Sequence, residues 1–402
     1  MPSSLSARYT NLRQHTLILS SPLSAEDQCV QSMSDTSPTK WHLAHTSWFF
    51  ENLVLLPFLS GYKVFDTSFS YLFNSYYEAL GPRHPRLQRG LLTRPSLSKV
   101  LAFRQYVDAA MQQLLSNTDP LNEQSLALIE LGLNHEQQHQ ELLLTDALHL
   151  LSCNPMLEAY DPGFKHTNAC SAALQWLTFD EGLRTFGRAV DAKGFAFDNE
   201  CPAHQRFVQS FQIATRLVTC GEYLAFIQDG GYENAELWLS EGRAHVLQNN
   251  WQCPLYWFAP EDPRACADHW QLFGLNGVQV LDPQAPVANL SFYEASAFAQ
   301  WAGARLPTEF EWETASEHPG MKDMHAQVWQ WTRSAYEPYP GFVPASGAVR
   351  EYNGKFMVGQ QVLRGSSLAT PAQHSRNTYR NFFPAAARWQ FSGLRLAKDN
   401  SN

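Results

Sequence analysis

The most constraining feature of the sequence is a long proline-free segment, Glu123 to Leu151, whose apolar residues recur with a period near 3.6. This pattern predicts an α-helix with a continuous apolar face, closed by Asn154-Pro155. Segments of the same kind run from Trp41 to Leu59 and from Leu97 to Leu115. Helices of this length must bury their apolar faces against one another. The sequence therefore predicts a bundle of roughly four long helices over residues 1–155.

The remainder of the chain has a different pattern. Tyr160-Asp161-Pro162-Gly163 lies in a mixed polar stretch, and we place a linker at residues 156–175. From 176 to 402, short β-prone pieces alternate with Gly, Pro, Asn and Asp turns, interrupted by one good helix, Ser291 to Gly303. A chain of 402 residues exceeds what one hydrophobic core usually supports. We therefore predict a helical bundle followed by a loop-rich α+β domain.

Composition excludes several classes of function. The net charge is −9 and the basic residues are scattered, which argues against nucleic-acid binding. The seven cysteines are odd in number and contain no C-x-x-C, so neither a disulfide framework nor a structural zinc site is expected. The longest apolar run, Leu53 to Leu59, is interrupted by Pro57 and is too short to span a bilayer. With no evident signal peptide, we expect a cytoplasmic protein without a membrane partner.

The strongest chemical signal is NHEQQHQE at residues 134–141, on the long helix. His135 and His139 lie about 40° apart on one face, one turn along, where two imidazoles can chelate one metal ion. Glu141 is about 240° from His135, so it is not expected to be a ligand. Gln138, about 60° to the other side, is placed to contact a substrate beside the metal. Two histidines at this spacing are often surface residues, but this helix should be buried.

A third ligand has to come from another helix. WHLAH at residues 41–45 offers His42 and His45, and spacing alone does not choose between them. Three neutral imidazoles would leave coordination positions open, as a catalytic site requires. Imidazole ligation suits Fe, Zn, Cu or Ni, so the residues leave the metal open.

Several segments resemble a known family. WHLAHTSWFFE and NHEQQHQELLLTD resemble the iron-binding segments of the EgtB family, the ergothioneine-biosynthetic sulfoxide synthases, on a DinB-like four-helix bundle. The second half resembles the formylglycine-generating-enzyme (sulfatase-modifying factor) fold, a loop-rich architecture of the C-type-lectin kind. Its marks are DNECPAH at 198–204, GEYLAFIQDGGY at 221–232, ARLPTEFEWETA at 304–315, VWQWTRSAY at 328–336, VLRGSS at 362–367 and FSGLRLA at 391–397. The order of the two domains makes the combination specific.

The resemblance implies that His45 is the first iron ligand, beside His135 and His139, and that His42 is a neighbour. It also implies an Fe(II)- and O2-dependent reaction. The thiol of cysteine or γ-glutamylcysteine would be joined, as a sulfoxide, to the imidazole carbon between the two nitrogens of hercynine (N-α-trimethylhistidine).

A proton donor is needed to separate sulfoxide synthesis from simple thiol dioxygenation. The resemblance favours Tyr76 or Tyr77 in FNSYYEALGPRHPRLQRG, with Tyr339 in YEPYPGF as the second candidate. For the thiol substrate's carboxylate we predict Arg86, with Arg83 as the alternate, because a guanidinium grips a carboxylate with two hydrogen bonds.

On the hercynine side, the resemblance implies contacts from Gln138 and Asn381. Phe382 and Phe383 are predicted to flank the trimethylammonium group through aromatic contact. The branch that accepts γ-glutamylcysteine carries an acidic residue where this chain has Phe383. This departure favours free cysteine as the thiol.

Other functions compete with this one. A selenoneine synthase or an ovothiol-type synthase would share the iron site, although ovothiol enzymes commonly carry a methyltransferase domain that this sequence lacks. Formylglycine generation needs a late cysteine pair, and no cysteine follows Cys266. A non-catalytic bundle holding zinc or nickel, and a structural Ca²⁺ in the second domain, also remain open.

Overall fold

The computed structural model describes residues 4–117, 121–165, 172–265, 268–344 and 353–400. Within these ranges the chain divides after Asp161 into two compact units, the second beginning at Pro162. Of the cysteines, Cys170 and Cys266 lie outside the described residues, and those that are described are free thiols.

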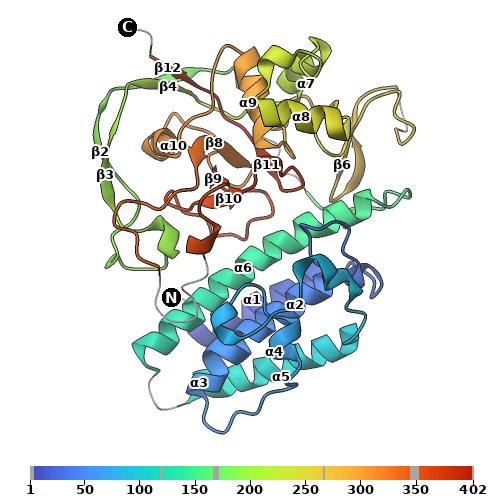
Figure 1. The fold of residues 1–402 in the computed structure, drawn as a ribbon, viewed down its shortest axis with the longest axis vertical. Helices are drawn as coiled ribbons and strands as arrows, with labels where there is room; N and C mark the ends of the chain where they lie inside the picture. Colours follow the sequence, from blue (N-terminus) through green and yellow to red (C-terminus); the bar gives the residue numbers. More distant parts are fainter. Residues whose placement is uncertain (1–3, 118–120, 166–171, 266–267, 345–352, 401–402) are drawn as a thin grey trace. The chain divides into compact units, whose positions relative to one another are not determined.

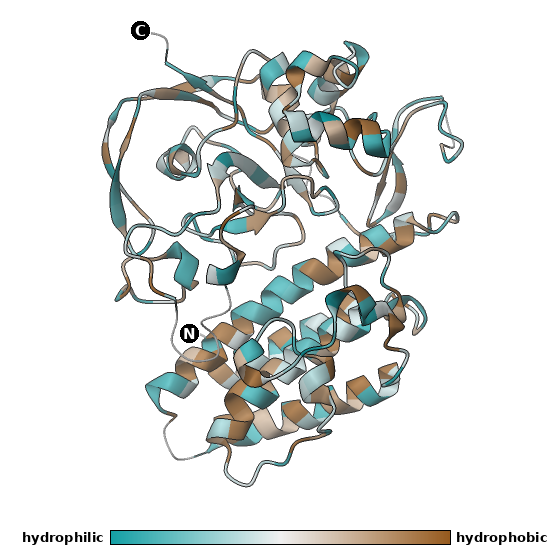
Figure 2. Cartoon of the chain, in the orientation of Figure 1, coloured by the Kyte–Doolittle hydropathy of each residue, from teal (hydrophilic) through white to brown (hydrophobic). Residues whose placement is uncertain are grey.

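The first unit is a bundle of four helices, α1 (Leu5–Ser20), α2 (Thr39–Phe50), α5 (Leu97–Ser116) and α6 (Glu123–Ser152). Helix α2 packs against α5 and α6, and α1 packs against the same two helices (Figure 1). The predicted bundle is therefore confirmed. Hydrophilic and hydrophobic residues are interspersed along α6, as expected for a helix with one buried face (Figure 2).

Helix α2 is buried on all sides, since every residue from Thr39 to Phe50 is buried. It continues into a π-helical turn, η2 (Glu51–Leu55), and then into α3 (Leu56–Phe58). We predicted one uninterrupted helix from Trp41 to Leu59. The structure instead widens the backbone just before Pro57, which has no N–H to donate and whose ring would clash with a regular preceding turn.

Short elements connect α3 to α5 and lie in the part of the chain that carries the predicted tyrosines and arginines. These elements are α4 (Phe69–Leu72) and the 3₁₀ turns η3 (Glu78–Leu80) and η4 (Arg86–Leu91). The loop before η3 is fixed by Asn74, whose amide nitrogen donates to the carbonyls of Tyr77 and Gly81 at 3.0 and 3.2 Å. A further 3₁₀ turn, η1 (Asp27–Cys29), follows α1.

The second unit combines small sheets with short helices. Its central sheet has the order β10-β9-β8-β11, in which β8 pairs antiparallel with β9 and parallel with β11. A second sheet has the order β1-β4-β12, a third has the order β5-β6-β7, and β2 and β3 form a ribbon. The strands are β1 (Trp176–Phe179), β2 (Gly182–Phe186), β3 (His204–Val208), β4 (Phe211–Ala214), β5 (Trp257–Phe258), β6 (Gln271–Gly274), β7 (Gly277–Val280), β8 (Trp329–Ala335), β9 (Gln361–Gly365), β10 (Asn381–Phe383), β11 (Ser392–Gly393) and β12 (Ala397–Asp399).

Three helices of this unit, α7, α9 and α10, begin with a capping box. In α7, α9 and α10, a Ser or Thr side chain accepts from the third residue of the helix, and the Glu at that position bonds back to the cap. Helix α9 corresponds to the predicted helix Ser291–Gly303. The helices are α7 (Cys220–Gln228), α8 (Ser240–Asn249), α9 (Phe292–Trp301) and α10 (Glu309–Ala315), with 3₁₀ turns η5 (Asp198–Glu200), η6 (Ala235–Leu237) and η8 (Gly354–Phe356).

In the part of the chain that the structure describes, none of the helices combines the length and apolar character needed to cross a bilayer.

Candidate metal centre

Three histidines converge in the first unit. His45 comes from α2, and His135 and His139 come from α6 one turn apart. The potential ligand nitrogens of the three rings all lie within 4.8 Å of one another. It is the only such cluster of three or more His, Cys, Asp or Glu side chains among the described residues. Two adjacent helices thus bring together the residues that the sequence had singled out.

The orientation of His45 is fixed by the backbone. Its Nδ1 lies 2.6 Å from the carbonyl oxygen of Phe73, which only accepts, so Nδ1 carries the proton and Nε2 has the lone pair. Trp41 and Trp48 stack on the ring at centroid distances of 4.6 and 5.6 Å. The His45 Nε2 atom is buried and has no hydrogen-bond partner within the described ranges. Such an orphaned nitrogen fits a metal ligand.

The ring of His139 is held by a second histidine, His42. Its Nδ1 lies 2.8 Å from Nδ1 of His42, and Nε2 of His42 lies 3.1 Å from the carboxylate of Asp146. The same Asp146 oxygen accepts from the backbone N–H of Ser37 at 2.8 Å. His42 therefore lies behind a predicted ligand, and the family resemblance gave it the same place.

Burial keeps the three rings neutral. It is the main cause that lowers the pKa of His135 to about 3 and holds the pKa values of His45 and His139 well below the ordinary range. For His45 and His139, repulsion from the neighbouring histidines adds to this effect. Neutral imidazoles with available lone pairs can bind a divalent metal without first losing a proton. The donor set fits iron, as it fits other first-row metals.

Beside these rings, α6 carries a second buried polar cluster around Glu136. The carboxylate accepts from Arg13 at 2.9 Å, from Thr16 at 2.6 Å and from Arg104. Burial opposes the ionisation of Glu136, but Arg104 and Arg13 outweigh it and lower its pKa to about 2. Arg13 also donates to Asp108. These bonds tie α1 and α5 to α6 and so fix the helix that carries the histidine pair.

The other polar residues of the motif lie at the margin of this face. Glu141 is half-buried and does not belong to the three-histidine cluster. Gln138 is also half-buried. Its predicted contact with hercynine stays a prediction.

The two predicted tyrosines of the connecting loop differ in burial. Tyr77 is fully buried and Tyr76 stacks on it, with ring centroids 4.7 Å apart. Tyr77 also lies 5.4 Å from Trp48, which itself stacks on His45. The pair thus belongs to the aromatic shell around the histidines.

The arginines of this loop are arranged in a way that the sequence did not indicate. Arg83 and Arg86 are exposed and donate to the backbone carbonyls of Ser75 and Asp35. Arg89 is buried, and its Cζ lies 3.4 Å from the centroid of the Trp41 ring.

Among the described residues, no carboxylate lies within ion-pair distance of Arg89, and Asp146 attracts its charge only from farther away. Its guanidinium donates to the hydroxyls of Ser37 and Ser75, and its Nε has no partner in the described part of the chain. Burial, with repulsion from Arg86 and Arg83, holds its pKa well below the ordinary range. A buried cation that Asp146 attracts only from beyond ion-pair distance suits an anionic ligand. Nothing in the sequence separated Arg89 from its neighbours, because only burial distinguishes it.

The predicted residues of the second unit occupy well-packed positions. The Tyr339 hydroxyl donates to Glu309 at 3.1 Å, and the ring belongs to a buried hydrophobic cluster. This bond gives the buried hydroxyl of Tyr339 a partner. The role of Tyr339 as a proton donor stays a prediction. Asn381 lies on β10, and its side-chain oxygen accepts from the next backbone N–H.

Phe382 and Phe383 point in different directions. They are consecutive in strand β10, and successive side chains of a strand point to opposite faces. Phe382 stacks on Tyr336 at 4.1 Å, whereas Phe383 meets Trp389 edge-on at 5.7 Å. The two rings therefore lie on opposite faces of β10, and their predicted contact with a trimethylammonium group stays a prediction. Only Phe383 shares the face of Asn381.

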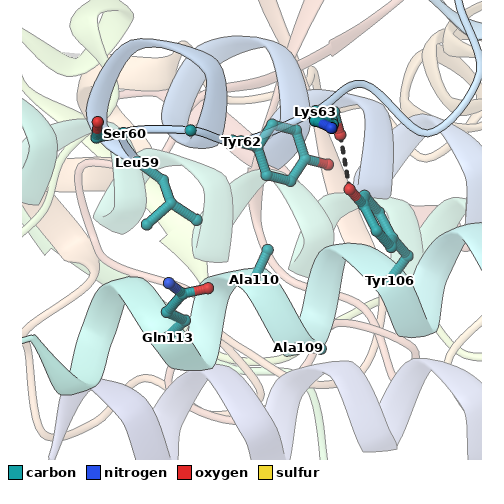
Figure 3. A pocket seen from close by; sticks show the side chains of 9 residues that line it. Leu59, Ser60, Tyr62, Lys63, Tyr106, Ala109, Ala110 and Gln113 are labelled. Carbon is teal, nitrogen blue, oxygen red and sulfur yellow. Dashed lines mark hydrogen bonds between the residues drawn. The ribbon is translucent and has the colours of Figure 1, made fainter.

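A separate cavity of about 340 Å³ lies between the chain after α3 and helix α5 (Figure 3). The Tyr106 hydroxyl donates to the Lys63 carbonyl at 2.8 Å along its wall. None of its lining residues is a His, Cys, Asp or Glu, so it offers none of the usual metal ligands. They are Leu59, Ser60, Gly61, Tyr62, Lys63, Tyr106, Ala109, Ala110 and Gln113.

Comparison with known proteins gives the same division of the chain. Residues 8–143 match the DinB superfamily, and residues 169–320 and 316–400 match the sulfatase-modifying factor enzyme 1-like domain. The chain is 31% identical to the hercynine oxygenase of Mycolicibacterium thermoresistibile, over 79% of this chain and 78% of that protein. This chain belongs to the EgtB, or hercynine oxygenase, family.

Two further relatives agree with this assignment. The hercynine oxygenase of Mycobacterium tuberculosis is 32% identical over 66% of this chain and 70% of its own length. Ergothioneine biosynthesis protein 1 of Schizosaccharomyces pombe is 26% identical over 51% of this chain and 28% of its own length. The family resemblance and the fold class predicted from the sequence are confirmed, and the EgtB-family chain is an oxygenase.

Proposed function

We propose that this chain is an Fe(II)- and O2-dependent sulfoxide synthase of ergothioneine biosynthesis. It would join the sulfur of cysteine, or of γ-glutamylcysteine, to the imidazole carbon between the two nitrogens of hercynine. The observation that carries the proposal is the cluster of three neutral imidazoles, buried His45 and His135 with half-buried His139, in a chain of the hercynine oxygenase family.

The overall reaction balances with dioxygen as the oxidant. The thiol S–H and the imidazole C–H bonds are broken, and a C–S bond and an S–O bond form. Dioxygen accepts four electrons, so one oxygen atom enters the sulfoxide and the other leaves as water. Iron held by the three histidines would supply the redox chemistry with dioxygen. Because the ligands are neutral and only three, room remains for substrates at the same centre.

For the anionic end of the thiol substrate, the chain offers Arg89 in addition to the predicted Arg86 and Arg83. Arg89 stacks on Trp41, which stacks on His45, so its charge lies close to the histidine cluster. Its repulsion also contributes to the lowered pKa values of His45 and His139. A substrate carboxylate would provide the direct ion pair that Arg89 does not form with any described residue.

Matched variants distinguish the arginines. We expect Arg89→Leu to raise the KM for the thiol by about 10- to 100-fold, since a charge-assisted hydrogen bond contributes about 1.5–3 kcal/mol. Arg86→Leu, at an exposed arginine bonded to a backbone carbonyl, should change KM much less. If Arg86→Leu raises the KM more than Arg89→Leu does, Arg86 is the main group that binds the substrate carboxylate.

Tyr76 and Tyr77 are our proposed source of the proton that directs the sulfur towards C–S bond formation. The contact of Tyr77 with Trp48, whose ring stacks on His45, supports their place beside the histidines. Removing the hydroxyl in Tyr76→Phe or Tyr77→Phe should shift the product from sulfoxide towards the sulfinic acid of the thiol. Tyr339, whose hydroxyl is bonded to Glu309, is the comparison variant.

The decisive experiment is product mass spectrometry with Fe(II), dioxygen, hercynine and each thiol in turn. We expect the cysteine sulfoxide conjugate as the main product, because Phe383 stands where an acidic residue would hold a glutamyl amino group. A large preference for γ-glutamylcysteine overturns the choice of thiol. A selenium donor used in preference to both thiols, or oxygen uptake with no C–S product, overturns the proposed reaction.

A further inference from the structure

We propose that Asp146 and His42 act as a relay that fixes the tautomer of His139, so that His139 presents only its Nε2 to a metal ion. Neither residue was singled out as a positioning group from the sequence. The inference rests on the proposed function only in assuming that the three histidines bind a divalent metal.

The first step concerns His42. An ionised carboxylate oxygen can only accept hydrogen bonds, and Asp146 Oδ2 lies 3.1 Å from His42 Nε2. The Nε2 atom of His42 must therefore carry a proton. A neutral imidazole has one N–H, so Nδ1 of His42 is left as an acceptor.

The second step passes this preference to His139. The Nδ1 atoms of His42 and His139 are 2.8 Å apart, and two lone pairs cannot form a hydrogen bond. His139 must donate from Nδ1, which leaves the lone pair on its Nε2. The carboxylate thus selects the metal-binding tautomer from one ring away, as outer-shell partners of metal-bound histidines commonly do.

The relay also positions two helices. Asp146 lies on α6 seven residues after His139, about two turns along the same face. Its Oδ2 accepts from the backbone N–H of Ser37, just before α2, at 2.8 Å. One carboxylate therefore fixes the start of α2, which supplies His45, and the ring of His139. By contrast, the Nδ1 of His45 donates to a neutral backbone carbonyl rather than to a group linked to a carboxylate.

A purely structural role makes a different prediction. Asp146 and His42 are buried, and buried polar groups need partners whatever their function. In that case, replacing His42 would lower the free energy of unfolding and leave the metal affinity of the folded protein unchanged. Metal affinity and the tautomer of His139 separate the two roles.

The metal test uses Co(II) as the probe, added anaerobically to the full metal-free chain in competition with a chromophoric chelator. His42→Leu removes the acceptor for His139 and should weaken Co(II) binding by about 10- to 100-fold. His42→Gln is the rescue variant, because its amide oxygen can accept from His139 while its NH2 donates to Asp146. We expect it to bind within a few-fold of the natural chain.

Two more variants complete the series. Asp146→Asn can keep an oxygen at the bonded position but loses the charge, so its loss of affinity should be smaller than that of His42→Leu. His149→Gln is the control on the same helix, at a histidine bonded to Ser32, and should leave Co(II) affinity unchanged. If His42→Leu does not fold, His42→Gln and Asp146→Asn still rank the contributions of hydrogen bond and charge.

The second readout needs no metal. Long-range nitrogen–proton NMR on the metal-free chain, with ¹⁵N-labelled histidine rings, reports which nitrogen of His139 carries the proton. We expect Nδ1–H in the natural chain and in His42→Gln, and a mixture in His42→Leu. Unchanged Co(II) affinity together with an unchanged tautomer in His42→Leu would overturn the relay. A chain that shows both effects yet forms no C–S product leaves the relay standing and overturns the proposed function.

Discussion

Helix α6 carries two buried polar clusters on neighbouring faces, one around Glu136 and the other around His135 and His139. The Glu136 carboxylate is saturated by arginine and hydroxyl donors. With Asp108, which pairs with Arg13, the cluster has two acidic and two basic groups, so its charges cancel within the protein. The histidine cluster contains no charge, and its ring nitrogens converge without an acid among them. The paired charges around Glu136 therefore hold the bundle together. The neutral histidine nitrogens are instead available to bind a metal cation.

Breaking the charged cluster should have the largest effect on stability. Glu136→Gln leaves Arg13 and Arg104 buried without their full counter-charge, and we expect it to cost about 3–5 kcal/mol of unfolding free energy. Urea denaturation of the metal-free chain measures this. Glu130→Gln is the matched control on the same helix. Glu130 pairs with the more exposed Arg8, so its loss should cost less than about 1 kcal/mol. Equal losses of unfolding free energy in Glu136→Gln and Glu130→Gln would contradict the special role of the buried cluster.

The histidine cluster should respond to metal in a way that the charged cluster does not. Anaerobic Co(II) at about 100 times its dissociation constant should stabilise the folded chain by about 2.7 kcal/mol. In His135→Ala this gain should disappear, because one of the ligands is gone. Chemical unfolding with and without metal provides the measurement. A gain that survives in His135→Ala would place the metal elsewhere.

The two clusters should also lose stability in different ranges of pH. The pKa of His135 is about 3 when folded, below its ordinary value of 6.5, so the ring takes up a proton more readily when unfolded. Its contribution is present above pH 6.5 and is lost as pH falls towards 3. At pH 5 the loss amounts to about 2 kcal/mol. Glu136, with a pKa of about 2 against 4.5, loses its contribution only as pH falls below 4.5.

Unfolding of the metal-free chain between pH 8 and pH 4 checks this prediction. His135→Ala should flatten the dependence between pH 6.5 and pH 5, and Glu136→Gln should leave that part of the curve unchanged in slope. If both variants change the pH dependence of the unfolding free energy over the same pH range, the two clusters do not titrate separately as predicted.

The sequence determined the pairing of His135 with His139 and the exclusion of Glu141, because helical geometry is local and fixes which residues share a face. It also indicated the two-domain order, since periodicity and turn composition are properties of short segments. The sequence did not predict the π-helical turn before Pro57. A proline shows where a regular helix fails, but it does not show which irregular backbone replaces the helix.

Only the tertiary structure decided which polar residues support these histidines. His42 and Asp146 come from different helices, and Arg89 differs from Arg86 in burial rather than in sequence pattern. The opposite orientation of Phe382 and Phe383 became clear once β10 was seen as a strand. Contacts between distant segments depend on how whole helices and strands pack. The sequence therefore predicted the histidines that converge, His45 only with the help of the family resemblance, whereas the contacts of Asp146 and Arg89 came from the structure alone.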